Sequence, residues 1–202
     1  MNAAEPLIVP ATAWRPQPWK NGGGTTYEIA RGDDTLGFTW RLSLAHVEAD
    51  GPFSLFPGVD RTIALIAGAG FTLRRAGETL VTLTEPLVPF AFSGDDALDC
   101  TLVCGPVRDL NLMVRRDAWR GRATRLDLER GELRGCAIHD RLLVFVAEGT
   151  VRLRGARERS LAELRALDTA VFARREPVTL EASATPCRLV VVSLDAPTVS
   201  AV

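Results

Sequence analysis

Residues that could bind a small molecule are concentrated in the stretch Trp19–Glu28, which reads Trp-Lys-Asn-Gly-Gly-Gly-Thr-Thr-Tyr-Glu. It combines a cation (Lys20), an amide (Asn21), a hydroxyl (Thr25) and a carboxylate (Glu28). Three consecutive glycines bury no side chain and are costly to order, so they belong where the backbone turns sharply or approaches another group closely. Two interpretations stay open: a tight loop before the first strand, and one wall of a polar site.

A second set of polar side chains lies on a predicted strand over residues 38–47, Phe-Thr-Trp-Arg-Leu-Ser-Leu-Ala-His-Val. Its period of two places Arg41 and Ser43 on one face. The planar fork of an arginine matches a carboxylate in bidentate fashion, and Ser43 adds a hydroxyl donor. Alternation alone does not distinguish a binding face from a solvent-exposed one.

Two further polar positions accompany these strands. Asp109-Leu-Asn111 places two polar side chains on one face of a late strand, which is also typical of a strand edge with satisfied polar ends. Arg61 follows Asp60 at the start of a strand, and the same Asp-Arg pair recurs at Asp140-Arg141. This recurrence favours a structural role for the pair.

Metal and covalent chemistry have no matching pattern. A cupin-type metal site needs two histidines one residue apart, a carboxylate and a third histidine, whereas the histidines of this chain are His46 and His139. There is no Gly-x-Ser-x-Gly elbow and no cysteine beside a suitable histidine. Gly22–Thr25 lacks the Lys-Thr ending of a phosphate loop. We therefore expect no metal, no cofactor and no catalytic residue.

The composition narrows the class of protein. The chain has 202 residues, 47% of them hydrophobic and 24% charged, with a formal net charge of −1. This balance argues against a nucleic-acid surface. No apolar run reaches the roughly 18 residues that a membrane span requires, and the N-terminus lacks the features of an export signal. We expect a cytoplasmic protein with reduced cysteines and no membrane partner.

Short strands separated by Gly and Pro predict an all-β protein with very little helix. Asp60, Arg61, Ala67, Leu73 and Arg74 recur 80 residues later as Asp140, Arg141, Ala147, Leu153 and Arg154, which indicates an internal duplication. Two copies in this length predict a bicupin, that is, two tandem cupin-type or jelly-roll β-barrels.

We assign residues 1–116 to an N-terminal cupin barrel that carries the ligand pocket, because its strands hold more polar residues. Residues 117–202 form a degenerate C-terminal barrel, packed with the first as one unit. Strand edges of such sheets would also let two chains pair as a homodimer.

Four stretches, taken in order, resemble one family. They are Trp19–Ile29, Trp40–Ala45, Asp50–Arg61 and Asp109–Arg116. Together they are similar to the HutD/Ves family of bacterial proteins, over about residues 8–195. The resemblance implies a bicupin fold, and no enzymatic activity is established for the family. HutD members accompany histidine-degradation genes and are thought to bind an intermediate such as N-formylglutamate or urocanate, thereby moderating the pathway.

The resemblance also marks the expected ligand-binding residues, to which we add Gly23 of the glycine turn as an N–H donor: Lys20, Asn21, Gly23, Thr25, Glu28, Arg41, Ser43, Arg61, Asp109 and Asn111. In this interpretation Lys20 and Arg41 take carboxylates. Asn21 and Asn111 recognise a formyl or amide group, and Glu28 orients a cation or accepts an N–H.

The predicted function is that of a non-enzymatic bicupin that binds a small anionic metabolite. Two alternatives stay open. One is a metal-free enzyme that acts on a similar acid with Glu28 or Asp109 as general base. The other is a structural or partner-binding protein of the stress response.

Overall fold

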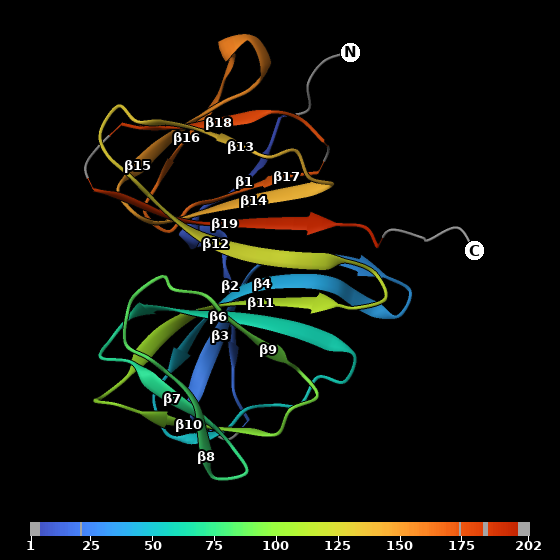
Figure 1. Cartoon of the computed structure of the whole chain (residues 1–202), viewed down its shortest axis with the longest axis vertical. Coiled ribbons are helices and arrows are strands. Elements are labelled where there is room, and N and C mark those ends of the chain that lie inside the picture. Colours follow the sequence, from blue (N-terminus) through green and yellow to red (C-terminus); the bar gives the residue numbers. More distant parts are fainter. Residues whose placement is uncertain (1–4, 21, 174, 184–185, 198–202) are drawn as a thin grey trace. The chain divides into compact units, whose positions relative to one another are not determined.

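The computed structural model describes residues 5–20, 22–173, 175–183 and 186–197. Within these ranges the secondary structure consists of strands and two short 3-10 turns, η1 (Ala11–Ala13) and η2 (Ala156–Glu158), and contains no α-helix (Figure 1). The predicted all-β class is therefore confirmed. The described part of the chain holds no helix that is both long and apolar enough to pass through a lipid bilayer.

The chain forms two compact units. One is Trp14–Trp119, and the other combines Met1–Ala13 with Arg120–Val202. The junction lies three residues beyond the predicted boundary at residue 116. The larger difference is at the N-terminus, because strand β1 (Leu7–Val9) pairs with β17 (Thr169–Phe172) and so belongs to the second unit. Local patterning could not reveal this, since a three-residue strand carries no information about its partner.

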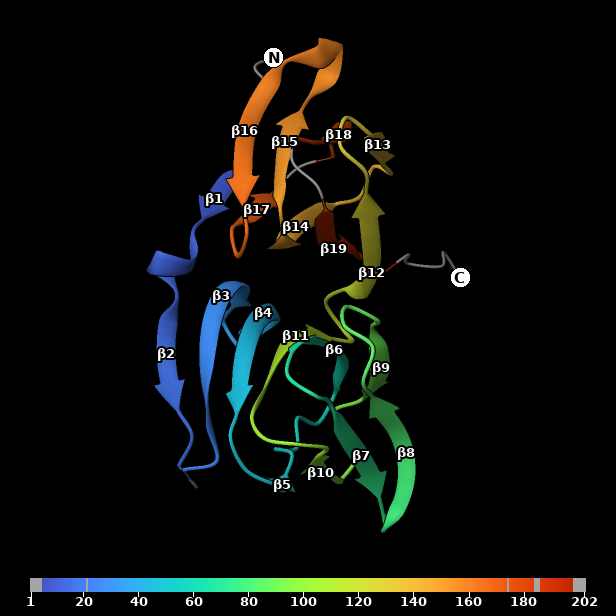
Figure 2. The same ribbon diagram turned by 90° about the vertical axis from the view of Figure 1, so that its left-hand side faces the viewer.

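The unit Trp14–Trp119 contains two sheets. The six-stranded sheet has the order β2-β3-β4-β11-β6-β9 and the four-stranded sheet the order β5-β10-β7-β8. In Figure 2, β2, β3 and β4 lie side by side. The bounds of these strands are β2 (Arg15–Pro18), β3 (Gly24–Asp34), β4 (Gly37–Val47), β5 (Gly51–Pro52), β6 (Val59–Ala67), β7 (Phe71–Arg75), β8 (Glu78–Leu83), β9 (Phe90–Ser93), β10 (Leu98–Leu102) and β11 (Val107–Arg115).

A hydrophobic core forms between these two sheets. Ile63 and Leu65 of β6 and Phe71 and Leu73 of β7 are buried in one cluster with Leu98 of β10. Alternate residues of each strand supply this cluster, as expected when one face of a strand is turned to the core. Polar residues on the same face of the six-stranded sheet, the face turned to the core, therefore lie on strands that the core holds in place.

The second unit also contains two sheets. Their orders are β1-β17-β14-β19-β12 and β13-β18-β15-β16. Their core includes Val144, Leu153, Phe172, Leu180 and Leu189, all buried. The remaining strands are β12 (Arg120–Leu128), β13 (Leu133–Cys136), β14 (Arg141–Glu148), β15 (Thr150–Arg154), β16 (Ser160–Arg165), β18 (Val178–Ala182) and β19 (Cys187–Asp195).

The internal duplication appears in the strand order. The order β9-β6-β11-β4 in one unit matches β17-β14-β19-β12 in the other, and β5-β10-β7-β8 matches β13-β18-β15-β16. The last strands, Val107–Arg115 and Cys187–Asp195, are 80 residues apart, as are Leu98–Leu102 and Val178–Ala182. Thus strand 98–102 corresponds to strand 178–182.

The register also corrects the alignment of the repeated Asp-Arg pair. Arg61 stands opposite Met113, whereas the position opposite Ser193, which is 80 residues beyond Met113, is Leu142. Arg141 is therefore not the counterpart of Arg61. The turn after β14 is one residue shorter than the turn after β6, which shifts the two repeats by one position relative to each other. The recurrence of the Asp-Arg pair therefore does not argue for a structural role of Arg61.

Candidate functional site

The strand register brings the predicted polar residues into adjacent rows on one face of the six-stranded sheet. Arg41 pairs with Met113, Ser43 with Asn111, and Ala45 with Asp109 between β4 and β11. On the other side of β11, Met113 pairs with Arg61 of β6. Residues two apart on a strand share a face, so side chains far apart in sequence point to the same side.

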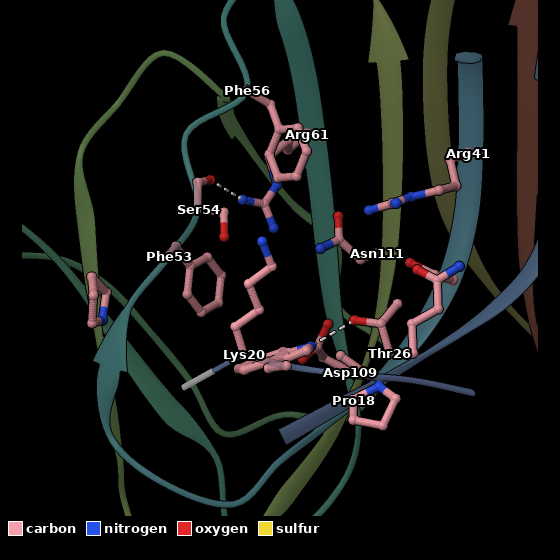
Figure 3. A pocket seen from close by; sticks show the side chains of 15 residues that line it. Pro18, Lys20, Thr26, Arg41, Phe53, Ser54, Phe56, Arg61, Asp109 and Asn111 are labelled. Atoms are coloured by element: carbon pink, nitrogen blue, oxygen red, sulfur yellow. Dashed lines mark hydrogen bonds between the residues drawn. The ribbon is translucent and has the colours of Figure 1, made fainter. Parts of the chain in front are cut away.

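These side chains line a cavity of about 520 Å³ in the unit Trp14–Trp119. Its floor is the inner face of the sheet. One wall is the loop after β5, with Phe53, Ser54 and Phe56, and the other is the segment Gln17–Lys20 (Figure 3). A concave site of this size with a few convergent polar groups suits a small molecule.

Arg61 is the most enclosed cation of the cavity and is only 6% exposed. Its guanidinium carbon lies 5.1 Å from the ring centroid of Phe53, 5.5 Å from that of Phe56 and 4.9 Å from that of Phe92. It donates one hydrogen bond, of 3.3 Å, from Nη1 to the carbonyl oxygen of Ser54. Burial lowers the pKa of Arg61 to about 10, an effect that the nearby Asp109 opposes. The aromatic faces hold the charge by cation–π attraction.

Arg41 is a second, half-buried cation on the same face. Its guanidinium lies 5.4 Å from the ring of Phe38 and 5.8 Å from that of Phe56, and its Nη2 donates to the sulfur of Met113 at 3.1 Å. Burial lowers the pKa of Arg41, whereas the neighbouring carboxylate of Glu28 raises it. The ring of Phe56 therefore lies within cation–π range of both arginines.

Asp109 and Asn111 supply the acceptors of the cavity floor. They are 1% and 8% exposed. Among the described residues, Oδ1 of each has no hydrogen-bond partner, and the same holds for Nε of Arg41 and Nε of Arg61. Burial raises the pKa of Asp109 to about 7, although Arg61 acts in the opposite direction. Buried polar groups are almost always paired in native proteins, so these four atoms indicate a polar ligand or water.

The glycine turn positions the third cation. The indole Nε1 of Trp19 donates to Oγ1 of Thr26 at 2.8 Å, and the side chain of Lys20 extends into the cavity (Figure 3). A Cβ on Gly24 would lie 2.3 Å from the carbonyl oxygen of His46, and Gly22 has a φ of +71°. The glycines thus allow a turn and a close approach to β4, which is the structural interpretation of the triplet.

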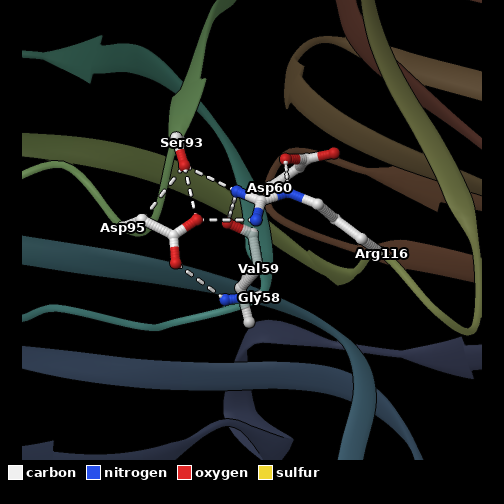
Figure 4. A network of polar contacts seen from close by, with 6 residues as sticks. All are labelled: Gly58, Val59, Asp60, Ser93, Asp95 and Arg116. Atoms are coloured by element: carbon white, nitrogen blue, oxygen red, sulfur yellow. Dashed lines mark hydrogen bonds and ion pairs between the residues drawn. The ribbon is translucent and has the colours of Figure 1, made fainter.

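The loop after β5 is fastened by a polar network around Asp95 (Figure 4). One carboxylate oxygen of Asp95 accepts the amide of Gly58 at 3.0 Å, and the other accepts the hydroxyl of Ser93 at 2.8 Å and pairs with Arg116 at 2.6 Å. The Gly58 amide is the main cause that lowers the pKa of Asp95 to about 2. Arg116 also pairs with Asp60. This network holds the end of the loop that carries Phe53 and Phe56.

The predicted site residues fall into three groups. Six line the cavity: Lys20, Arg41, Ser43, Arg61, Asp109 and Asn111. Gly23, Thr25 and Glu28 are not among the lining residues, and Asn21 lies outside the described residues. Whether any of these residues binds a ligand remains a prediction.

Thr25 and Glu28 lie near the cavity in different ways. Thr25 pairs with His46, on the opposite face of the sheet from the cavity. Glu28 pairs with Ser43 and shares its face, and its Oε2 is buried without a hydrogen-bond partner among the described residues. Glu28 therefore borders the site one strand beyond its lining.

Several lining residues escaped prediction. Thr26, rather than Thr25, faces the cavity, and Trp19, Gln17 and Ser54 also line it. Phe53 and Phe56, in a loop with two prolines, could either plug the end of the core or close the mouth of the cavity. Phe53 does both, since it packs against the core cluster and lines the cavity. The sequence offers one signal for Thr26: it lies two residues before Glu28 on the same strand, so the two side chains share a face.

The duplicated unit lacks this chemistry at the matching positions. The strand register matches Asp109 with Leu189, Asn111 with Val191, Ala45 with Leu126 and Arg61 with Leu142. A smaller cavity of about 340 Å³ occurs there, with Arg122 and Thr124 in place of Arg41 and Ser43. The buried polar floor therefore exists in one copy. The described residues contain no cluster of three or more His, Cys, Asp or Glu side chains that could hold a metal ion.

Comparison with known proteins agrees with this architecture. The structure matches that of a conserved protein of unknown function from Pseudomonas aeruginosa PAO1 with a TM-score of 0.87 and 35% identity, covering 96% of this chain and 100% of that one. HutD from Pseudomonas fluorescens SBW25 matches with a TM-score of 0.79 and 30% identity, over 95% and 99% of the two chains. A cupin barrel protein of Leptotrichia buccalis, 10% identical with a TM-score of 0.58 and coverage of 90% and 96%, supports the cupin fold.

Sequence relatives point the same way. An uncharacterised 21.2 kDa protein in the hutC 3' region of Pseudomonas putida is 39% identical over 67% of this chain and 70% of its own length. Protein Ves of Citrobacter koseri is 43% identical over 49% and 52%. The family model HutD matches residues 11–189. The chain is thus a member of the HutD family.

Proposed function

We propose that this protein binds a small carboxylate metabolite, of the kind of N-formylglutamate or urocanate, and thereby moderates histidine utilisation. The observation that carries the proposal is the convergence of Lys20, Arg41 and Arg61 on one cavity. Arg61 is buried and Arg41 is half-buried, and burying a charge is costly unless a partner compensates it. An anion would supply that compensation.

The acceptors of the floor support a ligand that is more than a bare anion. Oδ1 of Asn111 and Oδ1 of Asp109 lie on one strand, beside the arginines, and lack hydrogen-bond partners among the described residues. A molecule with a carboxylate and an amide N–H would satisfy both sets of groups. The link to histidine utilisation rests on family membership and on the relative named for its hutC neighbourhood.

A thermal-shift panel tests this function. The panel contains N-formyl-L-glutamate, trans-urocanate, glutarate and neutral glutaramide as the uncharged control. A ligand at 100 times its dissociation constant adds about 2.7 kcal/mol of stability, which corresponds to about 5–10 °C for a chain of this size. We expect a shift with at least one acid and none with the amide. No shift with any acid, even at millimolar concentration, would contradict the proposal.

A second candidate is a proton-transfer enzyme that acts on the same acids. It is favoured by Asp109, whose pKa of about 7 places a carboxyl in the range of a general acid or base inside the cavity. Proton NMR of N-formyl-L-glutamate or trans-urocanate incubated with the protein distinguishes the two. Binding without turnover supports the binding protein, whereas turnover that Asp109→Asn abolishes supports the enzyme.

A further inference from the structure

Asp109 is a buried carboxyl at the floor of a cavity that otherwise collects positive charge. It is 1% exposed, and its partners in register on the two adjacent strands are Ala45 and Leu65. Neither neighbour can compensate a negative charge. Oδ1 has no hydrogen-bond partner among the described residues. The ionised form of this side chain is therefore poorly stabilised by its surroundings.

The charged and titratable groups that face Asp109 come from several elements. Arg61 of β6 and Arg41 of β4 are in register with Met113, four residues along β11 from Asp109. Lys20 enters from the segment before β3. Two further ionisable groups belong to the surroundings: the carboxyl of Glu28 on β3, which pairs in register with Ser43, and the thiol of Cys100 on β10. Burial, together with Asp109 itself, raises the pKa of the Cys100 thiol to about 12.

We propose that Asp109 couples the binding of an anion in this cavity to the uptake of one proton. The inference rests on the proposed function and extends it. A solvent proton adds to the Asp109 carboxylate as the ligand carboxylate enters, so one negative charge replaces another beside the arginines. The resulting O–H becomes a donor to a ligand oxygen. Protonated Asp109 thus attracts a ligand oxygen that accepts its hydrogen bond, whereas ionised Asp109 would repel that oxygen.

The direction of the pH dependence follows from the charges. Burial already raises the pKa of Asp109 to about 7, and a bound anion raises it further because like charges oppose ionisation. The complex then binds more protons than the free protein. Affinity is constant well below pH 7 and falls above it, by about tenfold between pH 6 and pH 8.

Isothermal titration calorimetry with N-formyl-L-glutamate and with glutarate tests this coupling in the full-length chain. The carboxylates of both probes stay ionised from pH 6 to pH 8. Titrations in Bis-Tris and in Tris, which are cationic buffers of different ionisation enthalpy, report the protons taken up. We expect about half a proton per chain at pH 7, rising towards one at pH 8.

Two variants assign the proton to Asp109. Asp109→Asn keeps the shape of the side chain and cannot titrate, so we expect binding with no proton uptake and less than a twofold change in affinity between pH 6 and pH 8. Asp99→Asn is the matched control, because Asp99 is exposed on β10 of the same unit. It should behave like the unmodified protein.

The outcomes separate this inference from the proposed function. Binding with a flat pH profile in the unmodified protein overturns the coupling and leaves the binding function intact. Equal proton uptake in Asp109→Asn overturns the assignment to Asp109. If neither acid binds at any pH, the proposed function fails and the coupling fails with it. Should Asp109→Asn not fold, the pH profile of the unmodified protein decides by itself.

Discussion

At the scale of single residues, the cavity is built from charges that are unfavourable to bury. The pKa of Arg61 is lowered to about 10 and that of Asp109 is raised to about 7, in both cases mainly by burial. Each shift means that the folded protein holds the charged form at a cost. Buried ionisable groups with shifted pKa values are concentrated at functional sites, so these two residues mark the site more clearly than the exposed ion pairs do.

Replacing Arg61 should separate binding from stability. Arg61→Met fills the space among the three phenylalanines without a buried charge, and Asp109, which loses its cationic neighbour, can stay neutral by keeping its proton. We expect the affinity for N-formyl-L-glutamate to fall at least 100-fold, while the free energy of unfolding changes by less than about 1.5 kcal/mol. Calorimetry and urea unfolding measure the two quantities. A loss of stability above about 3 kcal/mol would show that Arg61 is chiefly structural.

The protonation state of Asp109 also predicts a pH-dependent stability that needs no ligand. Its pKa rises from 3.8 to about 7 on folding, so the folded chain binds more protons than the unfolded chain between these values. Below pH 4 Asp109 is protonated in both states and does not lower the free energy of unfolding. As the pH rises from 4 to 7, Asp109 lowers the free energy of unfolding progressively. Asp109→Asn cannot ionise at this position, so its free energy of unfolding should rise relative to that of the unmodified protein between pH 4 and pH 8. We expect this relative gain to reach up to about 4 kcal/mol at pH 8. Urea unfolding at both pH values measures this gain, and an equal difference at both would contradict it.

At the scale of elements, strands and loops contribute differently to the cavity. The strands β4, β6 and β11 present Arg41, Arg61 and Asp109 by alternation. The loop after β5 and the segment Gln17–Lys20, which leads into the glycine turn, close the sides. The loop is fastened through Asp95, and the turn depends on the small size of its glycines. Preorganised walls reduce the entropy that a ligand must overcome on binding.

The glycine turn can be tested by adding one methyl group. Gly24→Ala would place a Cβ 2.3 Å from the carbonyl oxygen of His46, which forces β3 away from β4. We expect the free energy of unfolding to fall by about 1–3 kcal/mol. Gly51→Ala is the control, since a Cβ there meets no atom within 4 Å. Equal effects of the two substitutions in urea unfolding would show that the close approach at Gly24 does not matter.

The strand part of this site was predictable from the sequence, and the loop part was not. Alternation placed Arg41 and Ser43 on one face, and the same rule applies to Asp109 and Asn111, because the direction of a strand side chain is fixed by a period of two. No such rule fixes the direction of Trp19, Phe53 or Phe56, which depends on what the turn packs against. The partner of β1 was equally inaccessible, since strand pairing between distant segments leaves no local pattern.

At the scale of the whole molecule, the chain uses one fold twice and keeps polar chemistry in one copy. The two units share their strand order, yet the positions that match Asp109, Asn111 and Arg61 are Leu189, Val191 and Leu142. The duplication was visible in the sequence as an 80-residue offset. The register was not, because a shorter turn after β14 displaces the repeated Asp-Arg pair by one position.

This asymmetry predicts one binding site per chain. Arg41 and Arg122 occupy matching positions, opposite Met113 and Ser193. Arg41→Ala should weaken binding of N-formyl-L-glutamate at least tenfold, because a charge-assisted hydrogen bond contributes about 1.5–3 kcal/mol. Arg122→Ala should change it less than twofold. Calorimetry gives affinity and stoichiometry together, and two sites per chain, or equal effects of the two substitutions, would count against the asymmetry.

The central claim is that the cavity between the arginines and the Asp109–Asn111 strand holds a small carboxylate. A crystal structure of the chain with N-formyl-L-glutamate at a concentration that saturates binding in solution tests it most directly. We predict ligand density in this cavity, with one carboxylate within hydrogen-bonding distance of Arg61 or Arg41 and a polar group at Asn111. Ligand density elsewhere on the chain, with this cavity filled by water, would contradict the account.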